Sequence, residues 1–254
     1  MNLSDNQLDA AQRISHVAGW ELLEFGVVDS TSFVAAKLSA WHAVRADTQT
    51  AGRGRFQRSW VSDAGGLWLS AVVPTGVDRD RWQALPLVAG LAVIQSLKGF
   101  GLVSARLRWP NDIMVNERKL AGLLVDTFQP QLAVIGLGVN VTNHPAAHDP
   151  ALKETSTRLA DVVSQTPSLS ALTKAVLASI KSAVDVMAKA GFSALRPRIN
   201  ELWGGSRQVT IDLDGVQRSG LFTGIDEVGR LLLRDDTLGT TAFEPHQVRL
   251  LREL

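Results

Sequence analysis

A segment rich in glycine and arginine, residues 49–60, stands out among the residues able to do chemistry. Its glycines permit positive φ angles and a close approach of the backbone to a ligand. Its arginines supply planar donors for phosphate or carboxylate oxygens, and its tryptophan offers a ring that can stack on a purine. The residues concerned are Gln49, Gly52, Arg53, Gly54, Arg55, Arg58 and Trp60. Alone, they indicate equally an anion-binding loop and a solvated basic loop, for instance one that binds RNA.

A second segment places an amide, a carboxylate and a lysine near one another. Arg108-Trp-Pro-Asn111-Asp112 ends a predicted strand in a proline-bearing turn, and Lys119-Leu-Ala-Gly122 begins seven residues after the aspartate. Asp112 is able to hold Mg²⁺ directly or through water, and Lys119 is able to reach a phosphate or carboxylate. The alternative, which this segment alone favours, is an exposed ion pair on a hairpin that contributes little stability.

Two glycines interrupt an apolar strand in the segment Ile135-Gly136-Leu-Gly138-Val-Asn140. Glycine inside a strand marks close approach by a ligand or another backbone, or else plain strand packing. The segment is not a dinucleotide-binding fingerprint, because Val141 stands where the third glycine belongs and no helix is predicted to follow.

Other kinds of site find little support in the sequence. There are no cysteines, which excludes disulfides, thiol catalysis and cysteine-ligated zinc. His144 and His148 stand at a plausible ligand spacing, but no convincing third ligand accompanies them. Neither the Gly-x-Ser-x-Gly elbow of hydrolases nor the Gly-x-x-x-x-Gly-Lys-Ser/Thr phosphate loop occurs.

Composition bounds the class of protein. The 254 residues carry a net charge of +1 from 26 basic and 25 acidic residues, so no global field marks a nucleic-acid-binding or membrane-surface protein. The polar, acidic N-terminus is not a secretory signal, and no apolar run approaches the length of a membrane-spanning helix. We therefore expect a cytoplasmic protein that does not bind a membrane.

The elements that must position these motifs follow from hydrophobic spacing and turn signals. Strands are predicted over 20–28, 43–47, 66–73, 106–109, 113–115, 120–125 and 132–141, and helices over 4–17, 31–41, 85–100, 168–190 and 192–203. Oxygens of Ser30 and Thr31 are expected to cap the second helix. After Gly204–Gly205, short strands over 209–213, 219–225, 231–234 and 240–243 alternate with tight turns. This change predicts a domain over 1–204 and a small barrel over 205–254.

Taken together and in this order, the motifs resemble the catalytic domain of biotin protein ligases. The family's Ser-Thr-Asn is matched by residues 29–32, its glycine-arginine loop by 49–55, and its Lys-Trp-Pro-Asn-Asp by 108–112. Its Lys-Leu-Ala-Gly is matched by residues 119–122 and its Gly-x-Gly-x-Asn by 136–140, while 224–226 resembles part of its C-terminal barrel. The resemblance covers residues 20 to 252. Two departures are Ser32, where the family has asparagine, and Arg108, where it has lysine. Ser32 either caps the following helix or shapes the ring pocket.

The resemblance implies an α+β fold, in which a mixed β-sheet flanked by helices, like that of class II synthetases, precedes a small SH3-like β-barrel. It implies activation of biotin to biotinyl-5′-AMP by ATP and Mg²⁺, then transfer to a lysine of a biotin carboxyl carrier protein, without a tightly bound prosthetic group. The segment before Ser30 is too short for the DNA-binding domain of some members. We therefore expect no specific DNA binding, and a monomer or weak homodimer.

The resemblance also implies residue roles. The expected catalytic residues are Lys119, Arg53 and Arg55. The expected biotin-binding residues are Ser30, Thr31, Ser32, Gln49, Gly52, Arg53, Gly54, Arg55, Lys119, Gly122, Gly136 and Gly138. The expected adenylate-binding residues are Arg53, Arg55, Trp60, Asn111, Lys119 and Asn140, and Asp112 is the expected Mg²⁺ ligand. The valeryl chain of biotin is expected to lie along Gly122 and the segment Gly136–Gly138, where the glycines, having no side chains, make room for it.

Two alternatives remain at this point. Lipoate ligases and octanoyl transferases share the broad fold, but they lack this glycine-arginine loop. A non-enzymatic biotin-binding module has no need of Lys119 and Asp112 together with three loop arginines.

Overall fold

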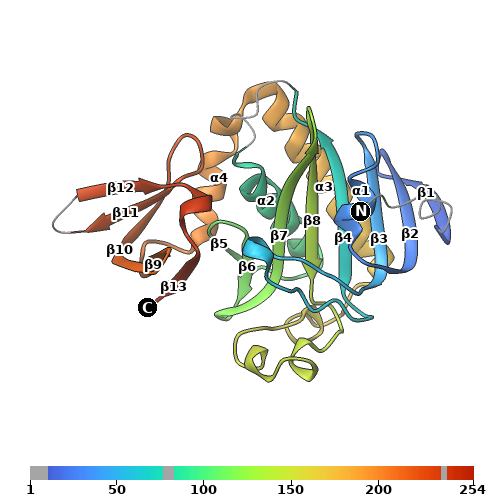
Figure 1. The fold of residues 1–254 in the computed structure, drawn as a ribbon, viewed down its shortest axis with the longest axis horizontal. Coiled ribbons are helices and arrows are strands. Elements are labelled where there is room, and N and C mark those ends of the chain that lie inside the picture. Colours follow the sequence, from blue (N-terminus) through green and yellow to red (C-terminus); the bar gives the residue numbers. More distant parts are fainter. Residues whose placement is uncertain (1–10, 77–82, 236–238) are drawn as a thin grey trace.

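An eight-stranded mixed sheet forms the larger part of the molecule in a computed structural model, which describes residues 11–76, 83–235 and 239–254. The strand order is β1-β2-β3-β4-β8-β7-β6-β5, and β2 and β3 are its parallel pair. The strands are β1 Arg13–Val17, β2 Trp20–Val28, β3 His42–Gln49, β4 Leu67–Pro74, β5 Arg106–Arg108, β6 Asp112–Val115, β7 Arg118–Gln129 and β8 Leu132–Val139. The five-residue helix α1 Thr31–Ala35 packs on one face, and the long helices α2 Leu85–Lys98 and α3 Leu169–Ala190 cover the other (Figure 1).

The alternation of side chains along β4 explains why the sheet has two different faces. Leu67 and Leu69 point into the large core beneath α2 and α3. Val72 points into a smaller core beneath α1. Ser70, an even-numbered position like Val72, therefore lies on the α1 face, where a buried hydroxyl needs a polar partner.

A second, five-stranded antiparallel sheet follows the helix α4 Arg196–Asn200, in the order β12-β11-β10-β9-β13. Its strands are β9 Arg207–Leu213, β10 Val216–Ile225, β11 Leu231–Asp235, β12 Gly239–Phe243 and β13 Leu250–Glu253. The sheet begins after Gly204 and Gly205, which both have positive φ. Its apolar side chains join the large core, and Figure 1 shows it beside β5 and β6. The predicted fold class is confirmed, whereas the predicted domain boundary after residue 204 stays a prediction.

Three predicted helices are wrong in part. Residues 13–17 form the edge strand β1 instead of a helix, while residues 4–10 of that prediction lie outside the described residues. The helix predicted over 31–41 ends at Ala35, because Trp41 adopts a positive φ and donates its backbone N–H to the Val72 carbonyl at 2.8 Å. The helix predicted over 192–203 is split into 3₁₀ turns and the short α4. Strand β13 was not predicted.

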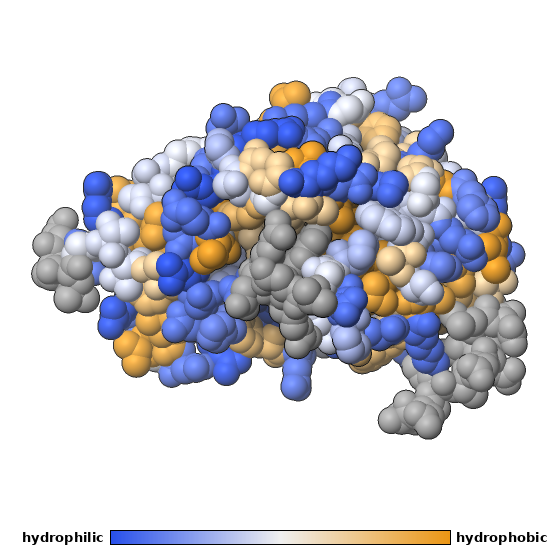
Figure 2. Space-filling view, turned by 90° about the horizontal axis from the view of Figure 1, so that it is seen from above, coloured by the Kyte–Doolittle hydropathy of each residue, from blue (hydrophilic) through white to orange (hydrophobic). Residues whose placement is uncertain are grey.

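The surface mixes polar and apolar side chains. Figure 2 shows hydrophilic and hydrophobic residues interspersed on the face seen from above. Among the described residues, none of the helices combines the length and the apolar character needed to cross a membrane.

Candidate functional site

Fifteen of the sixteen predicted site residues line one cavity of about 1250 Å³. The exception is Gly52, whose Cβ position would lie against the Ser62 hydroxyl and the Trp60 carbonyl. The sheet face that carries α1 forms the floor, and segment 53–61 forms one side. Two further walls were missed by the sequence analysis, namely segment 145–156 and the C-terminal segment 248–254. The predicted residues are thus brought together, although their individual roles stay predictions.

One end of the cavity is lined by hydrogen-bonding side chains from the start of α1 and the end of β3. Gln49 Oε1 accepts hydrogen bonds from the backbone N–H of Thr31 at 2.9 Å and from its hydroxyl at 3.1 Å. Ser32 bonds to the hydroxyl of Ser70 at 3.1 Å and lines the cavity, a geometry that favours a part in the ring pocket over a capping role. Ser30 occupies the N-cap position without a side-chain capping bond, so the predicted capping by Ser30 and Thr31 is wrong. The sequence analysis did not identify Ser70, because no motif marks this serine.

The middle of the cavity is built on the glycines of β7 and β8. Gly122 and Gly138 are directly opposite in the two strands, and the Trp60 indole lies against both. The Ser32 hydroxyl occupies the space above Gly136, 2.9 Å from where a Cβ would be. Protein side chains therefore fill much of the room that was expected for the valeryl chain, and Trp60 forms part of the cavity wall.

We expect Gly138→Ala to lower the free energy of unfolding by about 1–3 kcal/mol, the usual cost of overpacking a filled site. An added Cβ would lie 2.5 Å from Trp60 Nε1, so the indole must leave its place. Denaturant unfolding measures the change. Gly54→Ala is the matched control, because its Cβ would lie 3.5 Å from the nearest atom, the Arg58 carbonyl oxygen, at an ordinary φ of −115°. Equal loss in both variants would show that the indole is not held against Gly138.

The loop arginines point in different directions. Arg53 pairs with Asp126 at 2.8 Å, and its guanidinium stacks 4.1 Å from the centre of the Phe33 ring. Arg55 instead donates to the carbonyls of Pro245 and, at 3.0 Å, Val248 in the C-terminal sheet region. The geometry thus gives both arginines a part in holding the loop, against the sheet rim and against the C-terminal wall.

The opposite end of the cavity carries a group of charges around Asp112. Lys119 Nζ lies 2.6 Å from Asp112 Oδ1, and Arg108 donates to Oδ2 at 2.7 Å. Burial alone would raise the pKa of Asp112, but the charges and hydrogen bonds of Lys119 and Arg108 together hold that pKa below its ordinary value. Asp112 is therefore ionised and fixes the lysine. The sequence of residues 108–122 alone favoured an exposed ion pair on a hairpin. That interpretation is wrong, because the Asp112 carboxylate is largely enclosed.

The backbone on either side of Lys119 is fixed by a segment far along the chain. Lys119 N–H donates to the Thr155 carbonyl at 2.8 Å, and Thr157 N–H donates back to the Lys119 carbonyl at 3.0 Å. Asn140 Nδ2 holds the same segment through the Thr157 carbonyl at 3.1 Å, and Asn140 Oδ1 accepts from Asn143 at 3.1 Å. Both ends of the Asn140 amide are thus engaged within the protein.

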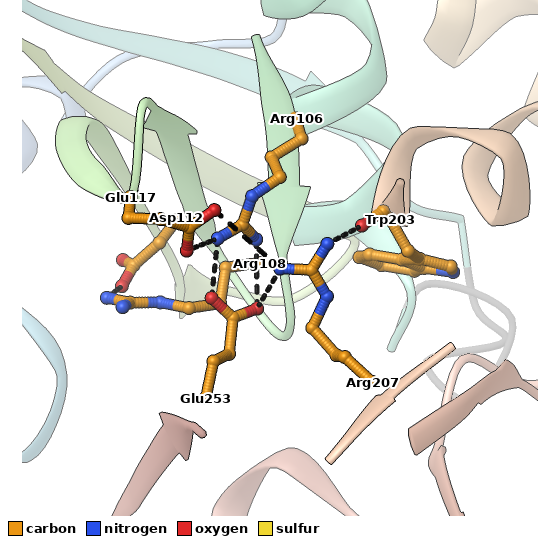
Figure 3. Close-up of polar contacts among 7 residues, drawn as sticks. All are labelled: Arg106, Arg108, Asp112, Glu117, Trp203, Arg207 and Glu253. Carbon is orange, nitrogen blue, oxygen red and sulfur yellow. Dashed lines mark hydrogen bonds and ion pairs between the residues drawn. The ribbon is translucent and has the colours of Figure 1, made fainter. Parts of the chain in front are cut away.

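An ion cluster joins the C-terminal strand to the hairpin that carries Lys119 (Figure 3). Arg106 on β5 makes two bonds, at 2.9 and 2.5 Å, with Glu253 on β13, and a third with Glu117 in the β6–β7 turn. Arg207 at the start of β9 lies 3.3 Å from Glu253 and donates to the Trp203 carbonyl. The C-terminal wall is therefore tied to the cationic end of the cavity.

Within residues 11–76, 83–235 and 239–254, no group of three His, Cys, Asp or Glu side chains is arranged to hold a metal ion. The cavity combines a hydrogen-bonding end, a middle walled by an indole and glycines, and a cationic end. It suits an elongated ligand with a polar head and an anionic tail.

Known proteins share both the sequence and the fold. Residues 27–140 match the model of the biotin/lipoate A/B protein ligase family. A biotin–[acetyl-CoA-carboxylase] ligase of Mycobacterium tuberculosis is 34% identical over 238 residues, which cover 87% of this chain and 86% of that protein. The bifunctional ligase/repressor BirA of Bacillus subtilis is 32% identical over 161 residues, or 59% of this chain. The match spans only half the length of that relative.

The solved structure of the biotin protein ligase from Aquifex aeolicus in complex with biotin and ATP has a TM-score of 0.82 and 26% identity. The alignment covers 92% of this chain and 99% of that one. It includes both the central and the C-terminal sheets of this fold.

Proposed function

Since this chain belongs to the biotin protein ligase family, we propose that it activates biotin with ATP and transfers the biotinyl group to a lysine of a carboxyl carrier protein. The observation that carries the proposal is one cavity with the Thr31–Gln49 hydrogen-bonding pair at one end and Lys119 at the other. A ureido ring suits the first end, which we call the ring end, and a carboxylate next to a phosphate suits the second.

In the first step, an oxygen of the biotin carboxylate attacks the α-phosphorus of ATP. The bond from the α-phosphorus to the oxygen that bridges it to the β-phosphorus breaks, so pyrophosphate leaves and biotinyl-5′-AMP is formed. Both reactants are anions, so the protein supplies positive charge and alignment instead of a nucleophile. We assign this task to Lys119, because Asp112, which is itself held by Arg108, keeps the lysine ammonium in one position.

In the second step, the neutral ε-amine of the carrier lysine attacks the carbonyl carbon of the mixed anhydride. The bond from that carbon to the phosphate oxygen breaks, AMP leaves, and the amine loses its proton to solvent. Before this step the adenylate must be kept from water. The loop 52–60, held by Arg53 and Arg55 against two different walls, is suited to cover it.

Asp112 does not fit a resident Mg²⁺ in this arrangement, because Lys119 and Arg108 engage both of its oxygens. A single carboxylate that is already neutralised offers little to a hard dication. We propose that Mg²⁺ binds to the phosphates of ATP, as part of the MgATP substrate, and that Asp112 serves to hold Lys119. No prosthetic group is part of the proposal.

The partner follows from the relatives, two of which are named as ligases of acetyl-CoA carboxylase. We propose a biotin carboxyl carrier domain of that class as the acceptor. We further propose that the protein acts in the cytoplasm, as a monomer or weak homodimer.

Biotin-dependent exchange of labelled pyrophosphate into ATP tests the proposed function directly. We expect exchange with biotin and none with lipoate or octanoate, since neither acid carries a ureido group for the Thr31–Gln49 pair. Exchange driven by lipoate and not by biotin would contradict the proposal. So would an absence of exchange with all three acids.

Replacing Ser32 with the family's asparagine is expected to raise the KM for biotin several-fold. The Ser32 hydroxyl lies 3.1 Å from that of Ser70 and close over Gly136, so a longer amide must displace one of them. A biotin titration of initial rates measures the effect, with Ser39→Asn at an exposed position as the control. An unchanged KM would mean that Ser32 does not shape the ring end.

A further inference from the structure

A continuous chain of polar side chains runs beneath the ring end of the cavity. The hydroxyl of Ser32 contacts that of Ser70 at 3.1 Å, and Ser70 contacts the Thr31 hydroxyl at 2.8 Å. Thr31 in turn contacts Gln49 Oε1 at 3.1 Å. Beyond Gln49, Nε2 lies 2.8 Å from the hydroxyl of Ser62. Ser32 lines the cavity, whereas Ser70 is fully buried behind it.

The direction of the Gln49 amide is fixed by two independent contacts. A backbone N–H can only donate, so the atom that faces the Thr31 N–H at 2.9 Å must be the carbonyl oxygen of the amide. At the other end, the Ser62 hydroxyl gives its proton to the Trp60 carbonyl at 3.0 Å. Ser62 is then left to accept from Gln49 Nε2. Both contacts give the same orientation.

This orientation determines where every hydroxyl proton in the chain lies, because each hydroxyl has one proton to give. Gln49 Oε1 cannot donate, so Thr31 must donate to it. With its proton used, Thr31 accepts from Ser70. With the Ser70 proton used in turn, Ser70 accepts from Ser32. All protons therefore point from Ser32 toward Gln49.

The consequence lies at the cavity surface. The Ser32 proton is directed inward at Ser70, so the Ser32 oxygen presents only lone pairs to a ligand. We propose that Ser70 is a positioning residue that makes Ser32 an obligate hydrogen-bond acceptor, and that this polarity selects a ligand with an N–H donor at its ring end. The inference rests on the proposed function, in which a ureido N–H of biotin is that donor.

The departure of Ser32 from the family's asparagine gives Ser70 this importance. An asparagine amide has its own donor and acceptor atoms, and it presents either one by rotating. A serine hydroxyl acts toward a ligand only as a hydrogen-bond acceptor when a neighbouring group accepts its proton. Gly136 completes the arrangement, because a Cβ there would lie 2.9 Å from the Ser32 oxygen. Ser32, Ser70 and Gly136 together form a site for one acceptor oxygen.

Ligand analogues report this polarity more directly than activity does. The probes are biotin and its two carbamate analogues, in each of which one ureido N–H is replaced by a ring oxygen. Calorimetry gives a Kd for each ligand, and the quantity compared between proteins is the Kd of the analogue divided by the Kd of biotin. In the wild type, one analogue sets its ring oxygen against the Ser32 lone pairs. We expect it to bind about tenfold to a hundredfold more weakly than biotin, the usual effect of an unpaired buried polar group.

Ser70→Ala frees the Ser32 proton to rotate toward the ligand, so the ratio for that analogue is expected to fall several-fold. Ser70→Thr keeps a hydroxyl and should keep the wild-type ratio. Ser62→Ala leaves the Thr31 N–H to orient Gln49, so affinities for both ligands change together and the ratio stays. Thermal unfolding of each variant separates these shifts from loss of fold. Should Ser70→Ala not fold, Ser70→Cys serves in its place, because its sulfur is a weaker acceptor for the Ser32 proton.

If Ser70→Ala, or Ser70→Cys used in its place, binds biotin and keeps the full wild-type ratio, the relay is overturned and the proposed function stays intact. A wild type that does not distinguish biotin from either analogue would also overturn the relay alone. A wild type that does not bind biotin at all would overturn the proposed function, and the inference with it.

Discussion

Lys119→Ala is expected to reduce biotin-dependent pyrophosphate exchange by about a hundredfold or more, since loss of one donor that stabilises a transition-state charge costs about 3 kcal/mol. The ammonium lies where two anions must meet, and its place is fixed by Asp112 and by backbone bonds on both sides. The fold should survive, because Asp112 keeps its partner Arg108 at 2.7 Å when the lysine is removed.

The readouts for this variant separate chemistry from binding and folding. Pyrophosphate exchange measures the first step, calorimetry measures biotin affinity, and thermal unfolding measures stability. Lys153→Ala is the control, because this lysine is exposed on the neighbouring 145–156 wall. Near-normal exchange in Lys119→Ala would refute the assigned role. A large loss of exchange in Lys153→Ala would show that general positive charge matters, and not the position of one ammonium.

Elements with strong local signals were predictable from the sequence. The strand 20–28, the helix that begins after Ser168 and the hairpin around Asn116–Glu117 agree with the structure. Each has a sharp boundary, such as the Ser168 side chain that accepts from Ala171 N–H, or the two positive φ angles of the hairpin turn. Hydrophobic spacing and turn chemistry are local properties, so one sequence suffices to reveal them.

Elements that depend on distant partners were not predictable. Edge strand β1 is mostly exposed and has no clear alternation of apolar residues. The helix α1 ends at Ala35, and the chain then turns so that Trp41 bonds to β4, which lies about thirty residues further along the chain. Strand β13 exists because it pairs with β9, about forty residues earlier. Tertiary bonds of this kind override local preference and leave no mark in the neighbouring sequence.

The candidate site shows the same division. Residues in motifs were found, because their types and order resemble a known family. Ser70 was missed, since a lone serine in an apolar strand has no pattern to distinguish it. The only available signal was its even-numbered register with Val72 on the α1 face. The carbonyls that receive Arg55 were also missed, because a backbone acceptor at Pro245 or Val248 has no residue type to identify it.

Arg55→Gly is expected to let the reactive adenylate escape while leaving its formation nearly intact. Arg55 joins the loop to the Pro245 and Val248 carbonyls, and its guanidinium lies 4.7 Å from the centre of the Phe56 ring, which Arg249 also contacts. Removing it abolishes these contacts, and glycine further loosens the backbone. The closed loop must offset an ordering entropy of about 1 kcal/mol or more per residue fixed. Hydrogen bonds from a charged donor contribute about 1.5–3 kcal/mol to that balance.

The test is incubation of the variant with ATP, biotin and serum albumin, followed by a probe for biotin on the albumin. A loss of 1.5–3 kcal/mol from the closed state corresponds to about tenfold to a hundredfold more open loop, and bystander labelling should rise by a comparable factor.

Arg58→Gly is the matched control in the same loop. The Arg58 side chain is exposed and donates to one carbonyl of the C-terminal wall, that of Arg249, at 3.2 Å, so its loss should raise labelling far less. Since Lys119, Asp112 and Arg108 are untouched, pyrophosphate exchange should persist in both variants. Unlabelled albumin with normal exchange in Arg55→Gly would mean that contacts between the loop and the C-terminal wall do not retain the intermediate.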